Sequence, residues 1–287
     1  MRSRWSDEEA AAVVARYGAR WGEELALRTY TSRLLGAEDR LVLHGGGNTS
    51  VKGIFTNRLG EAIAALYVKA SGHDLATLEP EGLPGLDLGY LRKLRALEAL
   101  DDEAMAGELR THLFDARSAT PSLETLVHAF LPEKFVDHTH ADAILALSNQ
   151  IGGERLVREA LGDDVAVLGY VRPGFQLARA VADAYEANAG CRGMVWMRHG
   201  LMTWGPTARA SYETMIDARA AYACPRRRRC PSGRPSHACD RWRPCCAAAW
   251  PSRAATRTGR TAGRSCCRSS PRRCWRSSTA TGAASGR

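Results

Sequence analysis

The first 223 residues predict a layered α/β domain, on three observations. Segments with helical periodicity alternate with short apolar runs of strand length. These residues have mixed charge, many Ala, Leu and Val, and only one cysteine, Cys191. A length of about 220 residues is also sufficient to bury a single core. We therefore expect one domain over residues 1–223, followed by a separate segment.

The composition changes abruptly at residue 224. Residues 224–287 carry 16 Arg, no Lys and a single acidic residue, and they contain eight of the nine cysteines but no Val, Ile, Leu, Met or Phe. The net charge of +9 arises from this tail, because residues 1–223 hold 24 basic and 30 acidic side chains. Without large aliphatic residues the tail cannot bury enough apolar surface to offset the entropy of ordering. We expect a low-complexity tail rich in Arg, Cys, Pro and Ser that is disordered or out of frame.

Three interpretations of the tail remain open. Clustered arginines are typical of nucleic-acid-binding arms. The cysteines suggest a metal site, but Cys245-Cys246 and Cys266-Cys267 are adjacent pairs without zinc-ribbon spacing. An out-of-frame translation of a GC-rich gene best explains the sharp boundary and the loss of aliphatic residues. We assign the tail no function.

Residues 1–223 have the composition of a cytoplasmic enzyme domain. A single cysteine excludes a disulfide framework. The start, MRSRWSDEEA, lacks the apolar region of a signal peptide. No uncharged apolar run approaches the roughly 18 residues of a membrane span. We expect a cytoplasmic location, no membrane partner and, for residues 1–223, no nucleic-acid partner.

The chain begins with two predicted helices and a glycine loop. Ser6 and the acids after it start a helix over 7–17, and a second helix follows over 20–35. Residues 41–43 are predicted to form a short strand leading into the loop 44–50. The glycine triplet of this loop allows backbone amides to turn toward a ligand. A plain glycine turn explains the loop equally well, and no dinucleotide fingerprint is present.

The next segment is predicted to form a buried strand over 65–70. Ser71-Gly72 follows at its end, which is a natural place for an anion, although any tight turn can use this pair. Residues 78–87 are rich in Pro and Gly and are expected to be a loop. Residues 88–100 and 101–114 have helical spacing.

The remaining elements keep the same alternation. Ser122 is expected to cap a helix over 123–131. After it we predict strand 134–139, helix 142–149, helix 154–162, strand 165–171, helix 175–187, strand 193–198 and helix 206–222. The connections are too short to fix the strand order.

A His-x-His pair provides the first candidate ligands. Alternate side chains of a strand share a face, so His138 and His140 are expected to point the same way and grip one metal ion. Two partly buried histidines are the plainer explanation of this pair. Asp137 and Asp142 flank it and are candidates for hydrogen bonding to the ligands or for capping a helix. His199, at the end of a separate buried strand, supplies a third imidazole and favours the metal site.

Glu124 is the candidate carboxylate. An acid in the first turn of a helix is favoured by the helix dipole by about 0.5 kcal/mol, which explains it without any function. Alternatively, Glu124 lies near the metal and carries a proton. Three histidines and a glutamate complete a tetrahedral metal site. We interpret the other histidines of this region as structural or surface groups: His44, His73, His112 and His128.

Five spaced motifs carry a family resemblance. They are Gly45–Ser50 (GGGNTS), Lys69–Gly72 (KASG), Pro121–Glu124 (PSLE), His138–Asp142 (HTHAD) and Arg198–Leu201 (RHGL). In this order they resemble class II aldolase/adducin-family proteins, above all the aldolase half of bacterial fused rhamnulose-1-phosphate aldolase/short-chain alcohol dehydrogenases. The resemblance implies a three-layer α/β/α domain with a mainly antiparallel central sheet. It also implies a divalent metal, usually zinc, and a homo-oligomer, commonly a tetramer, with active sites between subunits.

The resemblance also implies roles for single residues. The metal ligands would be His138, His140 and His199, with Glu124 as catalytic acid/base and occasional fourth ligand. The substrate phosphate would be held by Gly47, Asn48, Ser71, Gly72 and Ser122. Such a site suits retro-aldol cleavage, because a Lewis acid stabilises the developing enediolate. Glu124 would then protonate the enediolate carbon.

The expected function is a zinc-dependent aldolase that cleaves a ketose 1-phosphate, such as rhamnulose 1-phosphate, to dihydroxyacetone phosphate and an aldehyde. The alternatives are a pentulose-phosphate 4-epimerase, a non-catalytic adducin-like interaction domain and a broken gene product. Leu123 departs from the family, since related sugar-phosphate aldolases often have a second serine there. Nothing after residue 223 resembles a Rossmann unit, so the dehydrogenase half is absent from this sequence.

Overall fold

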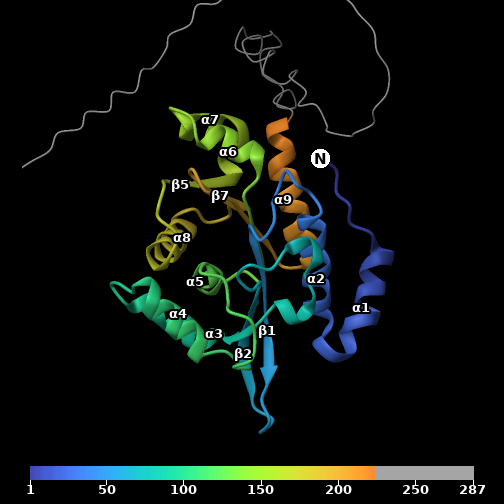
Figure 1. Ribbon diagram of the computed structural model, residues 1–287. Helices are drawn as coiled ribbons and strands as arrows, with labels where there is room; N and C mark the ends of the chain where they lie inside the picture. Colours follow the sequence, from blue (N-terminus) through green and yellow to red (C-terminus); the bar gives the residue numbers. More distant parts are fainter. Residues whose placement is uncertain (224–287) are drawn as a thin grey trace, which may run out of the picture. The chain divides into compact units, whose positions relative to one another are not determined.

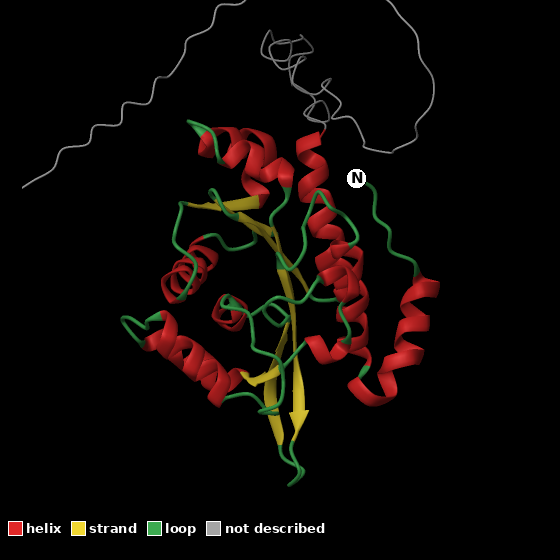
Figure 2. Ribbon diagram, in the orientation of Figure 1, coloured by secondary structure: helices red, strands yellow, loops and turns green. Residues whose placement is uncertain are grey.

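The computed structural model describes residues 1–223, which form a single mixed sheet with helices on both faces (Figures 1 and 2). The strand order is β3-β2-β1-β4-β7-β6-β5. Neighbouring strands are antiparallel except β5 and β6, which are parallel. The strands are β1 Asn48–Thr56, β2 Ala62–Val68, β3 Gly85–Asp87, β4 Phe135–Thr139, β5 Val165–Leu168, β6 Gly193–Trp196 and β7 Gly200–Gly205. The mainly antiparallel sheet is thus confirmed.

The helices divide into two layers. They are α1 Asp7–Trp21, α2 Glu23–Gly36, α3 Leu88–Lys93, α4 Asp102–Thr111, α5 Thr125–Phe130, α6 Asp142–Ser148, α7 Gly153–Leu161, α8 Phe175–Ala187 and α9 Ala208–Ala223. Helices α3, α4, α5 and α8 share one apolar core with the sheet, and α1, α2, α6, α7 and α9 share cores that include its other face (Figure 1). The three-layer α/β/α architecture is therefore confirmed.

The period-two pattern of the strands explains how one sheet serves two cores. On β6, Met194 and Trp196 pack against the layer that contains α5 and α8, whereas Val195 packs against the layer that contains α2 and α9. On β7, Met202 and Leu201 divide in the same way. Strands β6 and β7 are buried on both sides, so their sequences are mainly apolar.

One strand prediction and two loop predictions in the first half of the chain were wrong or incomplete. Residues 41–43 are not a strand: Leu41 and Val42 are buried in a turn, and both amides donate to the Glu38 carbonyl. The strand begins instead at Asn48, within the segment expected to be a glycine loop. The expected loop 78–87 contains the edge strand β3.

The last strand prediction missed a hairpin. The strand expected over 193–198 ends at Trp196, and a second strand, β7, returns from Gly200 to pair with it. A tight turn at Met197–His199 joins the two strands.

The predictions for the tail, residues 224–287, lie outside the described residues. In the part of the chain that the structure describes, we find no helix that is long and apolar enough to cross a membrane.

Candidate active site

Three histidines from two parts of the sheet meet at one point. His138 lies in β4, His140 directly follows this strand, and His199 lies in the turn between β6 and β7. The pairing of β4 with β7 sets His138 opposite Met202, which brings the turn to the end of β4. One ring nitrogen from each histidine lies within 4.8 Å of the others. The structure thus brings together the three imidazoles that the sequence singled out.

The turn that carries His199 is strained and tightly packed. Arg198 has a φ of 62°, a left-handed conformation that is uncommon for residues other than glycine. At Gly200 a Cβ atom would lie 2.4 Å from the Thr139 carbonyl oxygen and 2.8 Å from Cε1 of His138. Only glycine allows this close approach of β7 to the histidine rings.

The hydrogen bonding of His138 leaves its second nitrogen available. Nδ1 lies 3.2 Å from the Leu201 carbonyl oxygen, so Nδ1–H donates and Nε2 carries no proton. Among the described residues, the buried Nε2 has no hydrogen-bond partner. Burial lowers the pKa of His138 to about 3, and burial also lowers the pKa of His140. Neutral imidazoles with a free nitrogen fit a divalent cation.

Glu124 lies against this cluster. Its Oε1 is 3.0 Å from Nε2 of His199, and its Oε2 is 3.5 Å from Nε2 of His138. The Asn48 side-chain amide donates to Oε2 at 2.6 Å. Burial favours the neutral acid, but His138, His199 and Asn48 outweigh it and hold the pKa of Glu124 well below its usual range. The carboxylate is therefore ionised in the folded protein.

The residues expected at a phosphate come from three segments that converge. Gly47 has a φ of 64°, and a Cβ there would lie 2.8 Å from the His138 carbonyl oxygen. Gly45 packs against Gly72, whose φ is 75°. Asn48 Nδ2 also lies 3.4 Å from the Ser122 hydroxyl. The glycine loop and the two serine-containing turns are thus neighbours.

Two further contacts hold these segments together. The backbones pair through a bridge between Ala70 and Pro121, and the Ser71 amide donates to the Thr120 carbonyl at 2.9 Å. Ser71 and Gly72 are exposed.

Ser122 does not cap the helix as expected. Helix α5 starts at Thr125, with Glu124 at its N-cap position. The Ser122 hydroxyl accepts from the Glu124 amide at 3.2 Å, and its carbonyl accepts from the Thr125 amide at 3.0 Å. Ser122 thus caps the turn that carries Glu124.

Lys69 has a structural role that its motif, Lys69–Gly72, did not predict. It is 2% exposed, and its ammonium group donates to the carbonyls of Gly45 at 3.0 Å, His73 at 2.7 Å and Ala70 at 3.3 Å. Lys69 therefore fastens the glycine loop to the Ser71-Gly72 turn.

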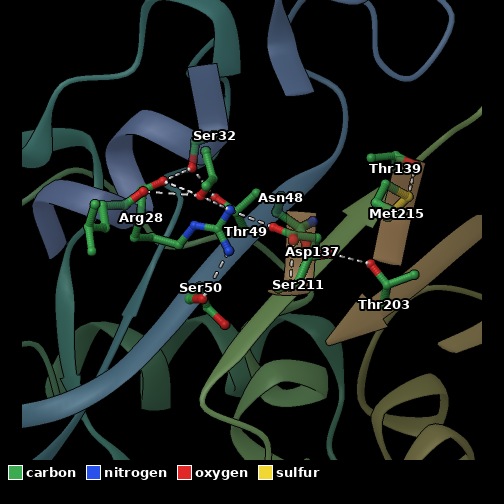
Figure 3. A network of polar contacts seen from close by, with 12 residues as sticks. Arg28, Ser32, Asn48, Thr49, Ser50, Asp137, Thr139, Thr203, Ser211 and Met215 are labelled. Carbon is green, nitrogen blue, oxygen red and sulfur yellow. Dashed lines mark hydrogen bonds and ion pairs between the residues drawn. The ribbon is translucent and has the colours of Figure 1, made fainter. Parts of the chain in front are cut away.

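The two acids that flank the histidine pair do not support the site directly. Asp137 is on the opposite face of β4, where it pairs with Arg28 at 2.6 Å and accepts from the Ser211 hydroxyl at 2.5 Å (Figure 3). Both members of this ion pair are fully buried. Asp142 is exposed in the first turn of α6. Hydrogen bonding of Asp137 to the ligands was a wrong alternative, because neighbours in a strand point to opposite faces. Asp142 is not the helix cap either, since Ala141 holds the N-cap position of α6.

His128 is a buried structural group, which is one of the two places expected for it. It is fully buried in α5, with Nε2 2.6 Å from the Asn48 carbonyl oxygen and Nδ1 2.7 Å from the Ser50 hydroxyl. Burial, aided by the charge of nearby Lys52, lowers its pKa to about 3. In the sequence, only its spacing of one helical turn from Glu124 indicates that His128 lies near the site.

Comparisons with known proteins agree with this architecture. Residues 27–224 match the family described as Class II Aldolase and Adducin N-terminal domain. The structure resembles the N-terminal class II aldolase domain of a conserved protein from Thermoplasma acidophilum, with 35% identity and a TM-score of 0.69 over 78% of this chain and 98% of that one. A sugar-phosphate aldolase from Thermotoga maritima, at 14% identity and a TM-score of 0.51 over 69% of this chain and 92% of that one, shares the fold.

A curated relative is the uncharacterized oxidoreductase YuxG of Bacillus subtilis (strain 168). It is 36% identical over 212 residues, which are 74% of this chain. The match covers only 30% of the Bacillus protein, so this chain corresponds to less than a third of its length. Together with the family match over residues 27–224, these similarities show that the chain belongs to the class II aldolase/adducin family.

Proposed function

We propose that residues 1–223 form a metal-dependent aldolase domain that cleaves a ketose 1-phosphate, with rhamnulose 1-phosphate as the first candidate. The products would be dihydroxyacetone phosphate and an aldehyde. One observation carries the proposal: the Glu124 oxygens lie 3.0 Å from His199 Nε2 and 3.5 Å from His138 Nε2. An ionised carboxylate thus adjoins three imidazoles, which is the arrangement that paired metal and proton chemistry needs.

His138, His140 and His199 would hold the cation, for which zinc is the natural choice. Imidazole suits zinc, and three protein ligands leave a position open for substrate. When bound, the cation supplies Lewis-acid polarisation of the substrate carbonyl. The Leu201 carbonyl fixes the tautomer of His138 by accepting from Nδ1–H at 3.2 Å.

Glu124 would carry the proton. Cleavage of the carbon–carbon bond converts a substrate hydroxyl to the aldehyde, which releases its proton, and leaves a carbon that must be protonated before the ketone product can leave. The ionised carboxylate would take up the first proton and deliver it to this carbon. Glu124 lies at the N-cap position of α5, and Asn48 donates to its Oε2. Its Oε1 lies 3.0 Å from His199 Nε2, so one carboxylate oxygen is anchored by Asn48 and the other would transfer the proton.

The phosphate would lie against the segments that Lys69 holds together. The proposed contacts are Gly47, Asn48, Ser71, Gly72 and Ser122. Small residues expose backbone amides and hydroxyls to an anion without a side chain in the way. The Asn48 amide nitrogen lies 2.6 Å from Glu124 Oε2 and 3.4 Å from the Ser122 hydroxyl, so Asn48 would link the phosphate and proton ends of the site.

We further propose that the protein is a cytoplasmic homo-oligomer whose partner is a small phosphorylated sugar. The residues of the site favour an enzyme over a non-catalytic, adducin-like interaction domain, since the three imidazoles and the carboxylate are all present and meet. A pentulose-phosphate 4-epimerase would use the same groups. The two activities are distinguished by which sugar phosphate the protein converts.

A product assay tests the proposal. The full chain, loaded with zinc, is incubated with rhamnulose 1-phosphate. Release of dihydroxyacetone phosphate is measured by coupling it to a dehydrogenase that reduces this product. We expect release of this product and its loss after chelation. Interconversion of pentulose 5-phosphates without cleavage would assign the epimerase instead. Inactivity on both classes, in protein shown to contain metal, would reject the enzymatic proposal.

A further inference from the structure

We propose that His128 is a positioning residue, which fixes the orientation of the Asn48 amide and thereby holds the Glu124 carboxylate. This inference rests on the proposed role of Glu124. His128 does not reach the histidine cluster; it acts through Asn48.

An unbroken chain of short hydrogen bonds supports the proposal. The Ser50 hydroxyl lies 2.7 Å from His128 Nδ1, His128 Nε2 lies 2.6 Å from Asn48 Oδ1, and Asn48 Nδ2 lies 2.6 Å from Glu124 Oε2. Ser50 and His128 are fully buried, and Asn48 is 5% exposed. Water therefore has little access to compete for these bonds, and each partner depends on the next.

The direction of every bond follows from the Asn48 amide. Its nitrogen lies 2.6 Å from Glu124 Oε2 and can only donate to it. The Asn48 carbonyl oxygen then faces His128, which requires a proton on His128 Nε2. His128 Nδ1 is left as the acceptor of the Ser50 hydroxyl.

The opposite tautomer of His128 would reverse this chain. With the proton on Nδ1, Nε2 would accept, and the Asn48 amide would turn over to donate to it. The Asn48 oxygen would then face the Glu124 carboxylate, and two acceptors at this distance repel each other. His128 thus selects the amide orientation that keeps Glu124 in place.

The backbone makes this arrangement rigid. Asn48 and Ser50 are two residues apart on β1 and therefore share a face. The amide of His128 bonds to the carbonyl of Glu124 at 3.4 Å, one helical turn earlier. The positioning group and the group it positions are thus fixed on the same short element.

The first test reads the tautomer directly and needs no activity. Long-range ¹H–¹⁵N spectra of the full chain labelled with ¹⁵N-histidine show which ring nitrogen carries the proton, and loss of one signal in His128→Gln assigns it. We expect a neutral His128 with the proton on Nε2 from pH 6 to 8. A proton on Nδ1, or an imidazolium in this range, would overturn the inference and leave the proposed reaction untouched.

The second test separates positioning from structure. The His128→Leu variant removes the donor, whereas His128→Gln places an amide N–H close to the position of Nε2. In zinc-loaded protein we expect His128→Leu to lower kcat at least tenfold with KM nearly unchanged, and His128→Gln to recover most of the loss. Equal kcat in folded His128→Leu and wild type would refute the inference. If wild-type cleavage itself is absent although the tautomer is as expected, the proposed function fails instead.

Discussion

The Glu124 carboxylate lies 3.0 Å from the ring of His199, although Glu124 precedes β4 and His199 lies between β6 and β7. The turn between β6 and β7 brings His199 to the end of β4, and the turn before α5 brings Glu124 to the same place. Long-range strand pairing therefore builds the site, because no single segment supplies all of its groups.

Loss of one imidazole should release the metal without unfolding the protein. His140 follows β4 and is partly exposed, so His140→Ala removes a ligand and leaves the core intact. We expect the affinity for zinc to fall at least tenfold, as measured by competition with a chromophoric chelator. The matched control is His73→Ala, which removes an exposed histidine outside the cluster. Equal affinity in the two variants would contradict the three-histidine site.

The buried ion pair behind β4 should be a major contributor to stability. Arg28→Met leaves the Asp137 carboxylate fully buried with the Ser211 hydroxyl as its remaining donor. Removal of one partner of such a pair typically costs about 3–5 kcal/mol. Urea unfolding should show this loss, whereas Arg158→Met, which breaks an exposed pair with Glu154, should change little. A similar small effect of both substitutions would contradict the burial of the pair.

The metal-free protein should lose stability as the pH falls from about 7 toward 3. Burial lowers the pKa of His128 to about 3, whereas a histidine in the unfolded chain has a pKa of about 6.5. Between these values the unfolded state binds a proton that the folded state excludes. The contribution of His128 to the free energy of unfolding is therefore at its full value above about pH 6.5. It falls by about 1.4 kcal/mol per pH unit on acidification below that pH.

His128→Gln isolates this contribution. Glutamine does not titrate, so the free energy of unfolding of the variant should depend less steeply on pH between 4 and 6. Urea unfolding of both proteins across this range measures the two slopes. Parallel slopes would show that His128 is not held neutral in the folded state.

Lys69 should matter for the phosphate and not for the reaction. Lys69→Met removes the bonds to the Gly45 and His73 carbonyls and frees the glycine loop from the Ser71-Gly72 turn. We expect the inhibition constant of inorganic phosphate and the KM of the phosphorylated substrate to rise on the order of tenfold, because hydrogen bonds from a charged group contribute about 1.5–3 kcal/mol.

Lys52→Met is the control for this prediction. Lys52 is similarly buried but donates to the Glu133 carbonyl, away from the glycine loop. Its substitution should leave phosphate inhibition unchanged. If both lysine variants weaken phosphate inhibition equally, the effect comes from general destabilisation. The proposal that Lys69 holds the glycine loop in place for the phosphate is then rejected.

The sequence predicted the candidate metal ligands and the carboxylate of the site better than the residues that hold them in place. The pairing of His138 with His140 follows from strand periodicity. His199 and Glu124 were singled out at the end of a strand and the start of a helix, and the family resemblance assigned their roles. The same periodicity places Asp137 on the opposite face from His138, so its absence from the histidine cluster was foreseeable. What the periodicity cannot supply is the identity of a partner that comes from a distant helix.

Residues that hold the site in place through long-range contacts were not predictable from the sequence. His128 meets Asn48 across 80 residues of chain, and Lys69 reaches Gly45 across 24. In the fold, β1 was obscured because its first residues, Asn48 to Ser50, follow a glycine triplet and resemble a turn. Tertiary pairing with β2 and β4 overrides that local preference.

The most direct test of the central claim compares metal content and cleavage in Glu124→Gln. Glutamine keeps the shape of the side chain but does not carry the proton, so we expect one zinc per chain, as in the wild type. We also expect the release of dihydroxyacetone phosphate from rhamnulose 1-phosphate to fall by about 10²–10⁴-fold. Wild-type release in Glu124→Gln that contains its zinc would contradict the assignment of Glu124 as the proton carrier of the site.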